Sequence, residues 1–420
     1  MQFNLVGVNH QTAPVSVREK LAINAEKLGD ALASVRSFVP QAVVLSTCNR
    51  TEIYAISDDN NGGQAILDFL ETRSSLPLGE LSQYLYVARG RQAAEHLFRV
   101  ASGLESMIVG EFEVLGQVKQ ALEAAEKAGM AGLPLRHVFH SAIGASRRVR
   151  EETGISKNAL SVSSVAVDLA AQVVGDLQQC RLVVIGAGEA GRLVAKVARE
   201  RGVSQIVIAN RTREKAKSLA DELHGIPIGM ESLTYEMDKA NIIVACAAAP
   251  HRILEVYHVQ EAMKDRAGLP LVIIDIAIPR NVEPEVNQIK DVYLYNLDGL
   301  TEISNANRKQ REGEMISAAE IVTVELNKFM EWWHDFEIRP VVSALMGRAE
   351  KIRTAQLDKT LKKLHPLNDE ERESLDAMTR SIVTKILKEP VQYLKENGNS
   401  SHSQIVKDLF KLDEEKIDEN

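Results

Sequence analysis

The sequence predicts a multidomain α/β protein, and three observations lead to that prediction. The chain has 420 residues, which is too long for one ordinary hydrophobic core. Strand and helix patterns alternate in the N-terminal part and again in the middle, whereas helical patterns alone fill the C-terminal part. We therefore expect three domains, at residues 1–155, 156–300 and 301–420.

The composition narrows the class of protein. Its hydrophobic and charged fractions, 45% and 26%, are those of a globular protein without a membrane span, and the N-terminus lacks a signal-peptide pattern. We expect a cytoplasmic location. The net charge of −8 argues against a general nucleic-acid coat protein but not against a nucleic-acid substrate. Three widely spaced cysteines, and histidines without metal-ligand spacing, predict neither a disulfide framework nor a metal site.

The N-terminal part has the element order βαββαβ, the ferredoxin-like pattern. The expected elements are Phe3–Asn9, Ala25–Phe38, Ala42–Cys48, Glu52–Ser57, Gln64–Arg73 and Tyr84–Ala88. Residues 91–152 then read as helical throughout, with an apolar stripe at helical spacing. The stripe consists of Leu115, Val118, Ala121, Leu122 and Ala125.

The middle of the chain predicts a Rossmann domain, a parallel sheet covered on both faces. After a helix at about 160–175, strands are expected at Arg181–Ile185, Gln205–Ala209, Asn241–Cys246, Leu271–Ile276 and Val292–Tyr295. The first strand leads into Gly186-Ala187-Gly188-Glu189-Ala190-Gly191 and then a helix. Gly186 permits a tight turn, Gly188 lets a pyrophosphate approach the backbone, and Gly191 lets helix and strand pack closely. A glycine-rich turn without a ligand is the alternative.

The end of the second expected strand indicates which dinucleotide is bound. NAD-specific sites place an acidic residue there to bond the ribose 2′-hydroxyl. This chain instead has Asn210, Arg211 and Thr212, followed by Arg213. Arginine suits a 2′-phosphate through its charge and forked geometry, so NADPH is the predicted cofactor. Solvated surface charges at Arg211 and Arg213 are the alternative.

The C-terminal part predicts a long amphipathic helix and an all-helical domain. The helix carries an apolar stripe and is expected to be interrupted at Pro340, with further helices around Val342–Leu364 and Glu370–Leu394. The stripe consists of Met315, Ala318, Val322, Leu326, Phe329 and Trp333. A stripe with little else to pack on favours a homodimer through these helices. A monomeric helical bundle is the alternative, and the charged residues 413–420 read as a solvated tail.

Cys48 is the candidate nucleophile. It ends an apolar run, and Arg50 follows two residues later. A thiol at a strand end near a guanidinium is placed where a thiolate is stabilised. Together with a hydride-carrying cofactor, this suggests the reduction of an acyl group held as a thioester. Cys180 and Cys246 are interpreted as structural cysteines.

Several segments, in the same order along the chain, resemble the glutamyl-tRNA reductase family. They are residues 7–14 (Gly-Val-Asn-His-Gln-Thr-Ala-Pro), 46–52 (Ser-Thr-Cys-Asn-Arg-Thr-Glu), 99–106, 110–119, 275–280 and 282–285. The resemblance implies NADPH-dependent reduction of glutamyl-tRNA to glutamate-1-semialdehyde with release of tRNA, the first step of five-carbon tetrapyrrole and haem biosynthesis. It also implies a V-shaped homodimer with a catalytic, an NADPH-binding and a dimerisation domain joined by a spinal helix. A transient complex with the aminotransferase that uses the aldehyde is a further expectation.

The same resemblance implies the site residues. Cys48 would attack the ester, and His96 matches a family position important for activity, with general acid or base assistance as one role. A histidine without a role is the alternative. Arg50 would bind a glutamate carboxylate or favour the thiolate. The implied substrate contacts are Thr47, Cys48, Asn49, Arg50, Ser106, Glu111, Phe112, Glu113 and Gln117.

Two departures from the family pattern and two alternative functions remain. The family commonly has Gln at the position of Glu113, so a carboxylate that only accepts replaces an amide that donates. It often has Asp at the position of Asn281, outside the nucleophile site. One alternative function is an NADP-dependent small-molecule dehydrogenase resembling shikimate dehydrogenase. The other is a non-catalytic tRNA-binding regulatory protein.

Overall fold

The computed structural model describes residues 1–57, 61–74, 76–111, 113–155, 161–264, 266, 268–300, 312–364, 367–397 and 400–412. The chain forms two compact units. The larger holds Gln2–Leu326, and the smaller holds Asn327–Asn420 together with Met1. Phe112 and the charged tail at 413–420 lie outside the described residues.

The N-terminal sheet confirms the ferredoxin-like prediction. Its strands are β1 (Gln2–Asn9), β2 (Gln41–Ser46), β3 (Arg50–Ser57) and β4 (Tyr86–Arg89). They pair in the order β2-β3-β1-β4, and every pair is antiparallel. The connecting helices are α1 (Val15–Leu21), α2 (Leu28–Val35), α3 (Gly62–Ser74) and α4 (Leu78–Leu81). The helix expected over 25–38 is shorter, because a 3₁₀ turn at Ala25–Lys27 precedes α2.

Three helices follow this sheet and cover it. They are α5 (Gly90–Ala101), α6 (Glu113–Lys127) and α7 (Leu133–Glu152). The predicted apolar stripe of α6 is buried, and Tyr54 of β3 packs edge-to-face on Phe139 of α7, with ring centroids 5.5 Å apart. The expectation of helix throughout 91–152 was wrong at the connection after α5, where Ser106 and Glu111 lie.

The middle domain holds a six-stranded parallel sheet in the order β10-β9-β8-β5-β6-β7. The strands are β5 (Arg181–Ile185), β6 (Gln205–Ala209), β7 (Ile226–Ile228), β8 (Ile242–Ala245), β9 (Leu271–Asp275) and β10 (Val292–Asn296). The helices are α8 (Val162–Val174), α9 (Glu189–Glu200), α10 (Arg213–Leu223), α11 (Leu233–Met237) and α12 (Val256–Met263). Short 3₁₀ turns lie at Leu177–Gln179, Met230–Ser232 and Pro284–Gln288.

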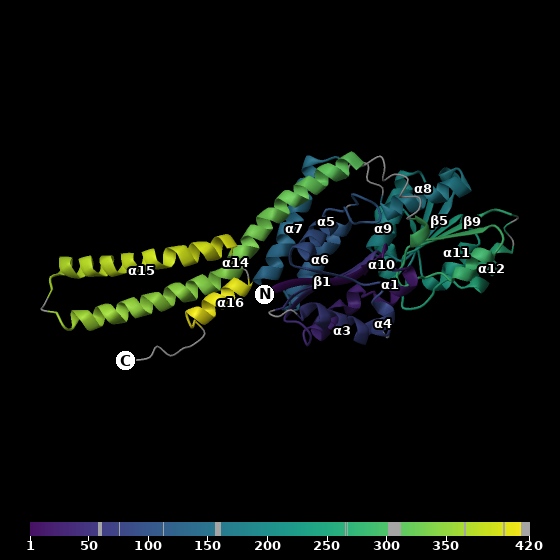
Figure 1. Cartoon of the computed structure of the whole chain (residues 1–420). Helices are drawn as coiled ribbons and strands as arrows, with labels where there is room; N and C mark the ends of the chain where they lie inside the picture. Colours follow the sequence, from purple (N-terminus) through teal and green to yellow (C-terminus); the bar gives the residue numbers. More distant parts are fainter. Residues whose placement is uncertain are drawn as a thin grey trace. The chain divides into compact units, whose positions relative to one another are not determined.

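Alternate residues of these strands form two buried clusters, one on each face of the sheet. Val184 and the strand residues on the same face, such as Ile208 and Val244, pack with α8, α9 and α10. Val183 and the strand residues on the other face, such as Val207 and Ile243, pack with α11 and α12. Figure 1 shows α8 and the α11–α12 pair on opposite sides of β5 and β9. The prediction of a parallel sheet covered on both faces is confirmed.

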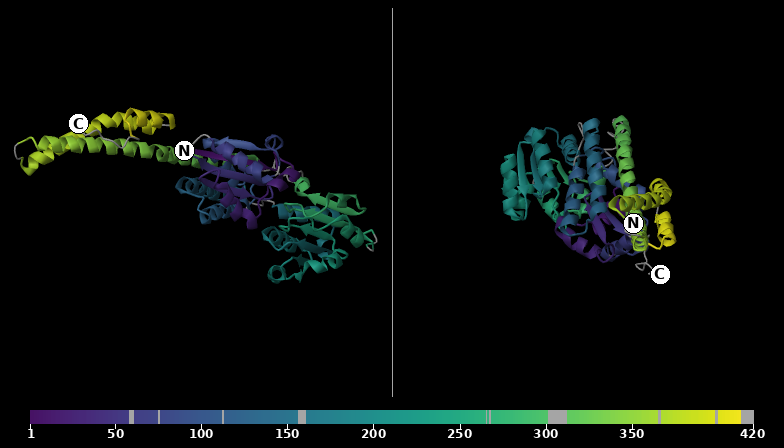
Figure 2. Two further views of the ribbon diagram at one scale, coloured as in Figure 1. Left: turned by 90° about the horizontal axis from the view of Figure 1, so that it is seen from below. Right: turned by 90° about the vertical axis from the view of Figure 1, so that its left-hand side faces the viewer.

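The C-terminal part contains α14 (Glu312–Leu361), α15 (Asp369–Asn397) and α16 (Ser400–Leu409). In Figures 1 and 2, α15 lies along the C-terminal part of α14. Arg353 Nη1 of α14 donates to Asp376 Oδ1 at 2.6 Å, and the His334 ring contacts the Lys395 carbonyl at 2.8 Å, so the two helices run antiparallel. Within the described part of the chain, no helix is long and apolar enough to cross a membrane.

The prediction that Pro340 interrupts this helix was wrong, because α14 continues through it. A proline inside a helix costs about 3 kcal/mol through a lost hydrogen bond and a steric clash. Buried side chains surround this position, at Ile338, Val341 and Leu345. Their burial offsets a cost of that size, since each buried aliphatic side chain contributes about 1.5–3 kcal/mol.

Candidate active site

Cys48 lies in the tight turn between β2 and β3. Thr47 closes the turn, because its amide donates to the Arg50 carbonyl at 2.8 Å and its hydroxyl accepts from the amides of Asn49 and Arg50 at 3.1 and 3.2 Å. The His10 amide donates to the Asn49 carbonyl at 2.9 Å and ties the turn to the end of β1. The turn is therefore fixed from both sides, and it presents the Cys48 side chain half-buried.

The cation that acts on Cys48 is Arg18, which the sequence analysis missed. Its guanidinium comes from α1 and is 2% exposed. Nη1 donates to the Cys48 carbonyl at 2.7 Å. Burial, then the charges of Glu111 and Glu113, raise the pKa of the Cys48 thiol to about 12, while the Arg18 charge opposes that rise. In this arrangement Cys48 is a neutral thiol.

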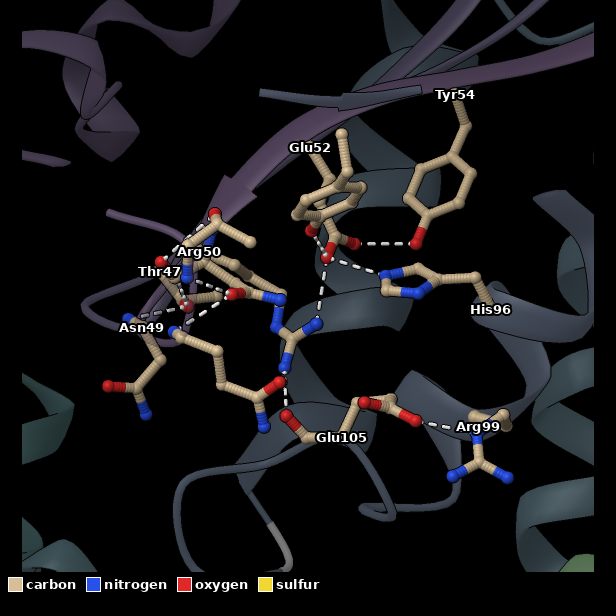
Figure 3. A network of polar contacts seen from close by, with 12 residues as sticks. Thr47, Asn49, Arg50, Glu52, Tyr54, His96, Arg99 and Glu105 are labelled. Carbon is tan, nitrogen blue, oxygen red and sulfur yellow. Dashed lines mark hydrogen bonds and ion pairs between the residues drawn. The ribbon is translucent and has the colours of Figure 1, made fainter. Parts of the chain in front are cut away.

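Arg50 serves a different group, a buried cluster around Glu52 (Figure 3). The Glu52 carboxylate is fully buried and accepts from Arg50 Nη1 at 2.7 Å, Tyr54 Oη at 2.5 Å and Tyr86 Oη at 2.5 Å. His96 Nε2 lies 2.9 Å from it. Burial alone would raise the pKa of Glu52, but the charges of Arg50 and His96 and the donated hydrogen bonds hold it well below its usual range. We call these five residues the Glu52 cluster.

The fold of the sheet explains how the Glu52 cluster forms. Arg50, Glu52 and Tyr54 occupy alternate positions of β3, so their side chains share one face. Gly7 of β1 pairs with both Glu52 of β3 and Tyr86 of β4. A Cβ atom at Gly7 would lie 2.7 Å from Glu52 Cγ. The glycine therefore leaves the space across which Tyr86 reaches Glu52.

The Glu52 cluster decides what His96 and Arg50 can do. Because Glu52 is ionised and can only accept, His96 must donate to it from a protonated Nε2. Nδ1 is then the ring nitrogen that takes no part in this contact. Arg50 Nη2 also donates to the Glu105 carbonyl at 2.5 Å, and the Glu105 side chain accepts from Arg99 Nε at 2.5 Å. Arg50 is thus engaged on both terminal nitrogens, and Arg18, not Arg50, is the guanidinium that favours the thiolate.

The remaining expected substrate contacts include two carboxylates near Cys48. Burial, then the Glu113 charge, raise the pKa of Glu111 to about 7, and Ser106 and Arg50 act in the opposite sense. Burial and the charge of Glu189 raise the pKa of Glu113. Ser106 is buried, and Gln117 lies one helical turn after Glu113 on α6. We call Cys48, Glu111 and Glu113 the Cys48 group.

The glycine-rich turn has the geometry of a dinucleotide site. Gly186 has φ +115°, and a Cβ there would lie 2.9 Å from the Ala247 backbone. A Cβ at Gly191 would lie 2.0 Å from the Gly186 carbonyl, so helix and strand pack as closely as predicted. A Cβ at Gly188 would meet nothing within 4 Å, and this open space in front of the α9 N-terminus fits a pyrophosphate. Glu189 and Ala190 form the first turn of α9.

The end of β6 lies beside this turn. The Asn210 side chain accepts from the Ala187 amide at 3.3 Å and donates to the Thr212 carbonyl at 3.0 Å, so it holds the two loops together. Arg211 and Thr212 are exposed, and Arg213 forms an ion pair with Glu231. A cavity of about 550 Å³ opens here, lined by Arg213, Glu214, Lys217, Pro227, Ile228, Gly229 and Ser232.

Comparison with known proteins gives the family. Family models match three consecutive segments, described as the N-terminal domain of glutamyl-tRNAGlu reductase (residues 6–153), shikimate/quinate 5-dehydrogenase (168–303) and the dimerisation domain of glutamyl-tRNAGlu reductase (317–412). A glutamyl-tRNA reductase of Sulfurihydrogenibium sp. is 38% identical over 412 residues, which cover 96% of this chain and 93% of the relative. This chain belongs to the glutamyl-tRNA reductase family.

Two further members of the family are similar along their whole length. The glutamyl-tRNA reductase of Pelobacter propionicus is 39% identical and covers 98% of this chain and 95% of its own. The solved glutamyl-tRNA reductase from Methanopyrus kandleri is 33% identical with a TM-score of 0.55, and the match covers 98% of this chain and 99% of that one. The resemblance inferred from the motifs is confirmed, and with it an oxidoreductase whose middle domain takes a nicotinamide cofactor.

The other cysteines and the second departure have structural explanations. Cys180 Sγ donates to the Asp176 carbonyl and Cys246 Sγ to the Ile185 carbonyl, each at 3.3 Å. The Asn281 side-chain oxygen accepts from the Ala247 amide at 2.9 Å, and its backbone amide donates to Asp275 Oδ2 at 2.9 Å. The Asn281 side-chain nitrogen donates to the Pro279 carbonyl at 3.4 Å, a bond that a carboxylate could not make, so the amide suits this place. Among the described residues, no group of three potential metal ligands comes together.

Proposed function

We propose that this protein reduces the glutamyl group of glutamyl-tRNA to glutamate-1-semialdehyde and releases the tRNA, as the first step of five-carbon tetrapyrrole biosynthesis. One observation carries the proposal beyond family membership. The Cys48 side chain packs against a buried cluster that joins Met107 and Ile108 to the core of the cofactor-binding domain. The charge of Glu189, in the glycine-rich turn, raises the pKa of Glu113, which in turn acts on Cys48. A nucleophile and a dinucleotide site that lie this close suit reduction of a covalently held acyl group.

Cys48 begins the reaction as the acyl acceptor. Its sulfur attacks the ester carbonyl, the C–O bond to the tRNA ribose breaks, and the leaving oxygen takes the thiol proton. A nicotinamide cofactor, when bound at the glycine-rich turn, would supply a hydride to the thioester carbonyl carbon. The resulting oxyanion takes up a proton, the C–S bond breaks, and the aldehyde leaves while Cys48 regains its thiol.

The other predicted residues orient the acyl group in this proposal. Glu52 fixes the His96 ring through Nε2, so Nδ1 is the nitrogen that would accept a proton in the reaction. Arg50 is held by its bond to Glu52, and the Thr47 hydroxyl fixes the turn that carries Cys48. The buried Asn49 Oδ1 and Glu113 Oε1 have no hydrogen-bond partner in the described protein, which supports contacts to substrate. Ser106, Glu111 and Gln117 complete the proposed set.

NADPH is the cofactor that we propose. A 2′-phosphate at the end of β6 would meet Arg211 and the cavity lined by Arg213 and Lys217. No acidic residue occupies positions 210–212. Arg211 together with Arg213 and Lys217, against the one acid of the lining, Glu214, supports a phosphate rather than a free ribose hydroxyl there.

The proposal extends to assembly and location. Exposed apolar residues recur on one face of α15, at Met378, Ile382, Ile386 and Tyr393, and support pairing of two copies through the dimerisation domain. We propose a catalytic domain at 1–155, a cofactor domain at 156–300 and a spinal and dimerisation region at 301–420. An aminoacyl-tRNA substrate favours a cytoplasmic reaction, and the reactive aldehyde product favours transfer to an aminotransferase in a transient complex.

Labelled glutamyl-tRNA tests the reaction. We expect wild-type protein to form labelled aldehyde only when NADPH is present. Without NADPH, label should accumulate as a thioester on the protein or appear as free glutamate, and Cys48→Ser should abolish both outcomes. Aldehyde formation by the serine variant would overturn the role of Cys48. Oxidation of shikimate with NADP⁺ that survives Cys48→Ser would instead support the small-molecule dehydrogenase, and tRNA binding without turnover would support the regulatory protein.

Cofactor preference is tested separately at Arg211. Arg211→Asp removes the cation and restores an acid that bonds a ribose hydroxyl, so affinity for NADPH should fall much more than affinity for NADH. Lys217→Gln, which removes a cation from the lining of the cavity at Arg213, serves as the matched comparison. Equal loss for both cofactors in the Arg211 variant would remove the 2′-phosphate assignment.

A further inference from the structure

Arg18 joins three segments through one buried guanidinium. Nε donates to the Ala13 carbonyl at 3.1 Å, Nη1 to the Cys48 carbonyl at 2.7 Å, and Nη2 to Asp298 Oδ1 at 2.7 Å. Asp298 follows β10 of the cofactor-binding sheet. Because the guanidinium is planar and its donors point in fixed directions, the Cys48 turn and Asp298 are held in one geometry.

The next residue of α1 makes a second link that does not involve the Cys48 turn. Glu19 accepts from the amide, Nε and Nη2 of Arg280 at 2.6, 2.8 and 3.2 Å. Arg280 follows β9. Both links therefore reach the carboxyl ends of neighbouring parallel strands, the edge at which such sheets hold their ligands.

Apolar contacts accompany these links. Met107 and Ile108, from the connection after α5, belong to the same buried cluster as Leu297 and Leu300, which follow β10. The Cys48 side chain packs against this cluster. The cofactor-binding domain thus packs against the segments that surround the nucleophile, an arrangement that suits hydride delivery to an acyl group on Cys48.

We propose that Arg18 is a positioning residue for the reduction step. Its bonds to Asp298 and to the Cys48 carbonyl fix the position of the cofactor domain relative to the acyl group on Cys48. The inference rests on the proposed function. Acyl transfer and reduction then depend on different contacts, because attack of Cys48 on the tRNA ester does not use the cofactor domain. Loss of the link should impair reduction and spare acyl transfer.

Asp298→Ala tests this division, since the Asp298 side chain is 49% exposed and its removal leaves the Cys48 turn intact. Acyl transfer is measured without NADPH, as release of tRNA from labelled glutamyl-tRNA in a single turnover. Reduction is measured as formation of labelled aldehyde with NADPH. We expect wild-type acyl transfer and an unchanged KM for glutamyl-tRNA, with kcat for aldehyde lower by about ten-fold or more, because small misplacements of reacting groups are costly.

Glu19→Gln is the matched control, because it weakens the link to Arg280 without touching a group bonded to the Cys48 turn. Its loss of aldehyde formation should be clearly smaller. Equal losses in the two variants would overturn the special role of Arg18, as would an Asp298→Ala variant that loses both steps alike or neither. If wild-type protein releases tRNA but forms no aldehyde, the proposed function fails instead.

Alkylation of Cys48 provides a readout besides turnover. Iodoacetamide should modify Cys48 faster in Asp298→Ala than in the wild type, because the docked domain no longer covers the thiol as firmly. Saturating NADPH should slow alkylation more in the wild type than in the variant. Identical rates in both proteins would contradict the coupling of Asp298 to Cys48.

Discussion

The Glu52 cluster and the Cys48 group are two sets of ionisable residues around the turn between β2 and β3. The pKa values of their buried carboxyl groups shift in opposite directions. In the Glu52 cluster the carboxylate meets a guanidinium, an imidazole and two phenols, and its pKa is lowered. In the Cys48 group, Glu111 has a second carboxylate as its neighbour, and its pKa rises to about 7. Burial is common to both, so the partners decide the charge state. The first group is satisfied within the protein, whereas the second has one buried oxygen, Glu113 Oε1, without a hydrogen-bond partner among the described residues.

The largest expected effect is that of Glu52→Gln. The substitution leaves the buried Arg50 guanidinium without its counter-charge and weakens three donated hydrogen bonds. Loss of one partner of a buried pair costs about 3–5 kcal/mol of unfolding free energy. Denaturant unfolding followed by circular dichroism measures it.

Glu105→Gln is the control for this prediction. The side-chain pair of Glu105 with Arg99 is partly exposed, at 20% and 33%, and should contribute less than about 1 kcal/mol. The carbonyl of Glu105, which accepts from Arg50, is unaffected. Similar losses in the two variants would mean that the Glu52 cluster is no more than a surface ion pair in energetic terms.

Ionisation of Glu111, unlike that of Glu52, should lower the free energy of unfolding. Because folding raises its pKa from 4.5 to about 7, ionisation of Glu111 opposes folding, and its cost appears as pH rises through this range. Above pH 7 that cost is on the order of 3 kcal/mol, since one pKa unit corresponds to about 1.4 kcal/mol. Glu111→Gln should therefore gain stability relative to the wild type between pH 5 and pH 8. A difference that stays constant across these pH values would contradict the raised pKa.

The smallest effect is expected from Glu113→Gln, which restores the residue common in the family. Removal of its charge should lower the pKa of Cys48 and shift the pH profile of alkylation to lower pH. We expect a several-fold faster reaction with iodoacetamide at pH 8 and an almost unchanged unfolding free energy. Glu126→Gln, at an exposed position of the same helix, should leave the profile where it is.

The sequence predicted the order of strands and helices well where buried strands are long and apolar. It missed β7, because three residues that include Pro227 give no strand pattern. It wrongly ended a helix at Pro340, since the local cost of proline was visible and the packing around it was not. Both errors concern short-range signals that tertiary contacts override.

The site was predicted to a similar extent. Cys48 and the glycine-rich turn were predicted from motifs and His96 from the family resemblance, but the Glu52 cluster was not predicted. A usable signal existed, because Arg50, Glu52 and Tyr54 alternate on a strand that is buried on both faces. Arg18 offered no such signal, since it lies thirty residues from Cys48 and no spacing rule connects them. Only the folded chain shows that it, and not Arg50, acts on the Cys48 turn.

The burial of Cys48 also affects its chemical durability between turnovers. Peroxide attacks thiolates, and a thiol whose pKa is about 12 offers very little thiolate at neutral pH. The packing of its side chain against an apolar cluster further restricts access. The resting enzyme therefore keeps its sulfur in the thiol form, which peroxide oxidises to sulfenic acid far more slowly than a thiolate.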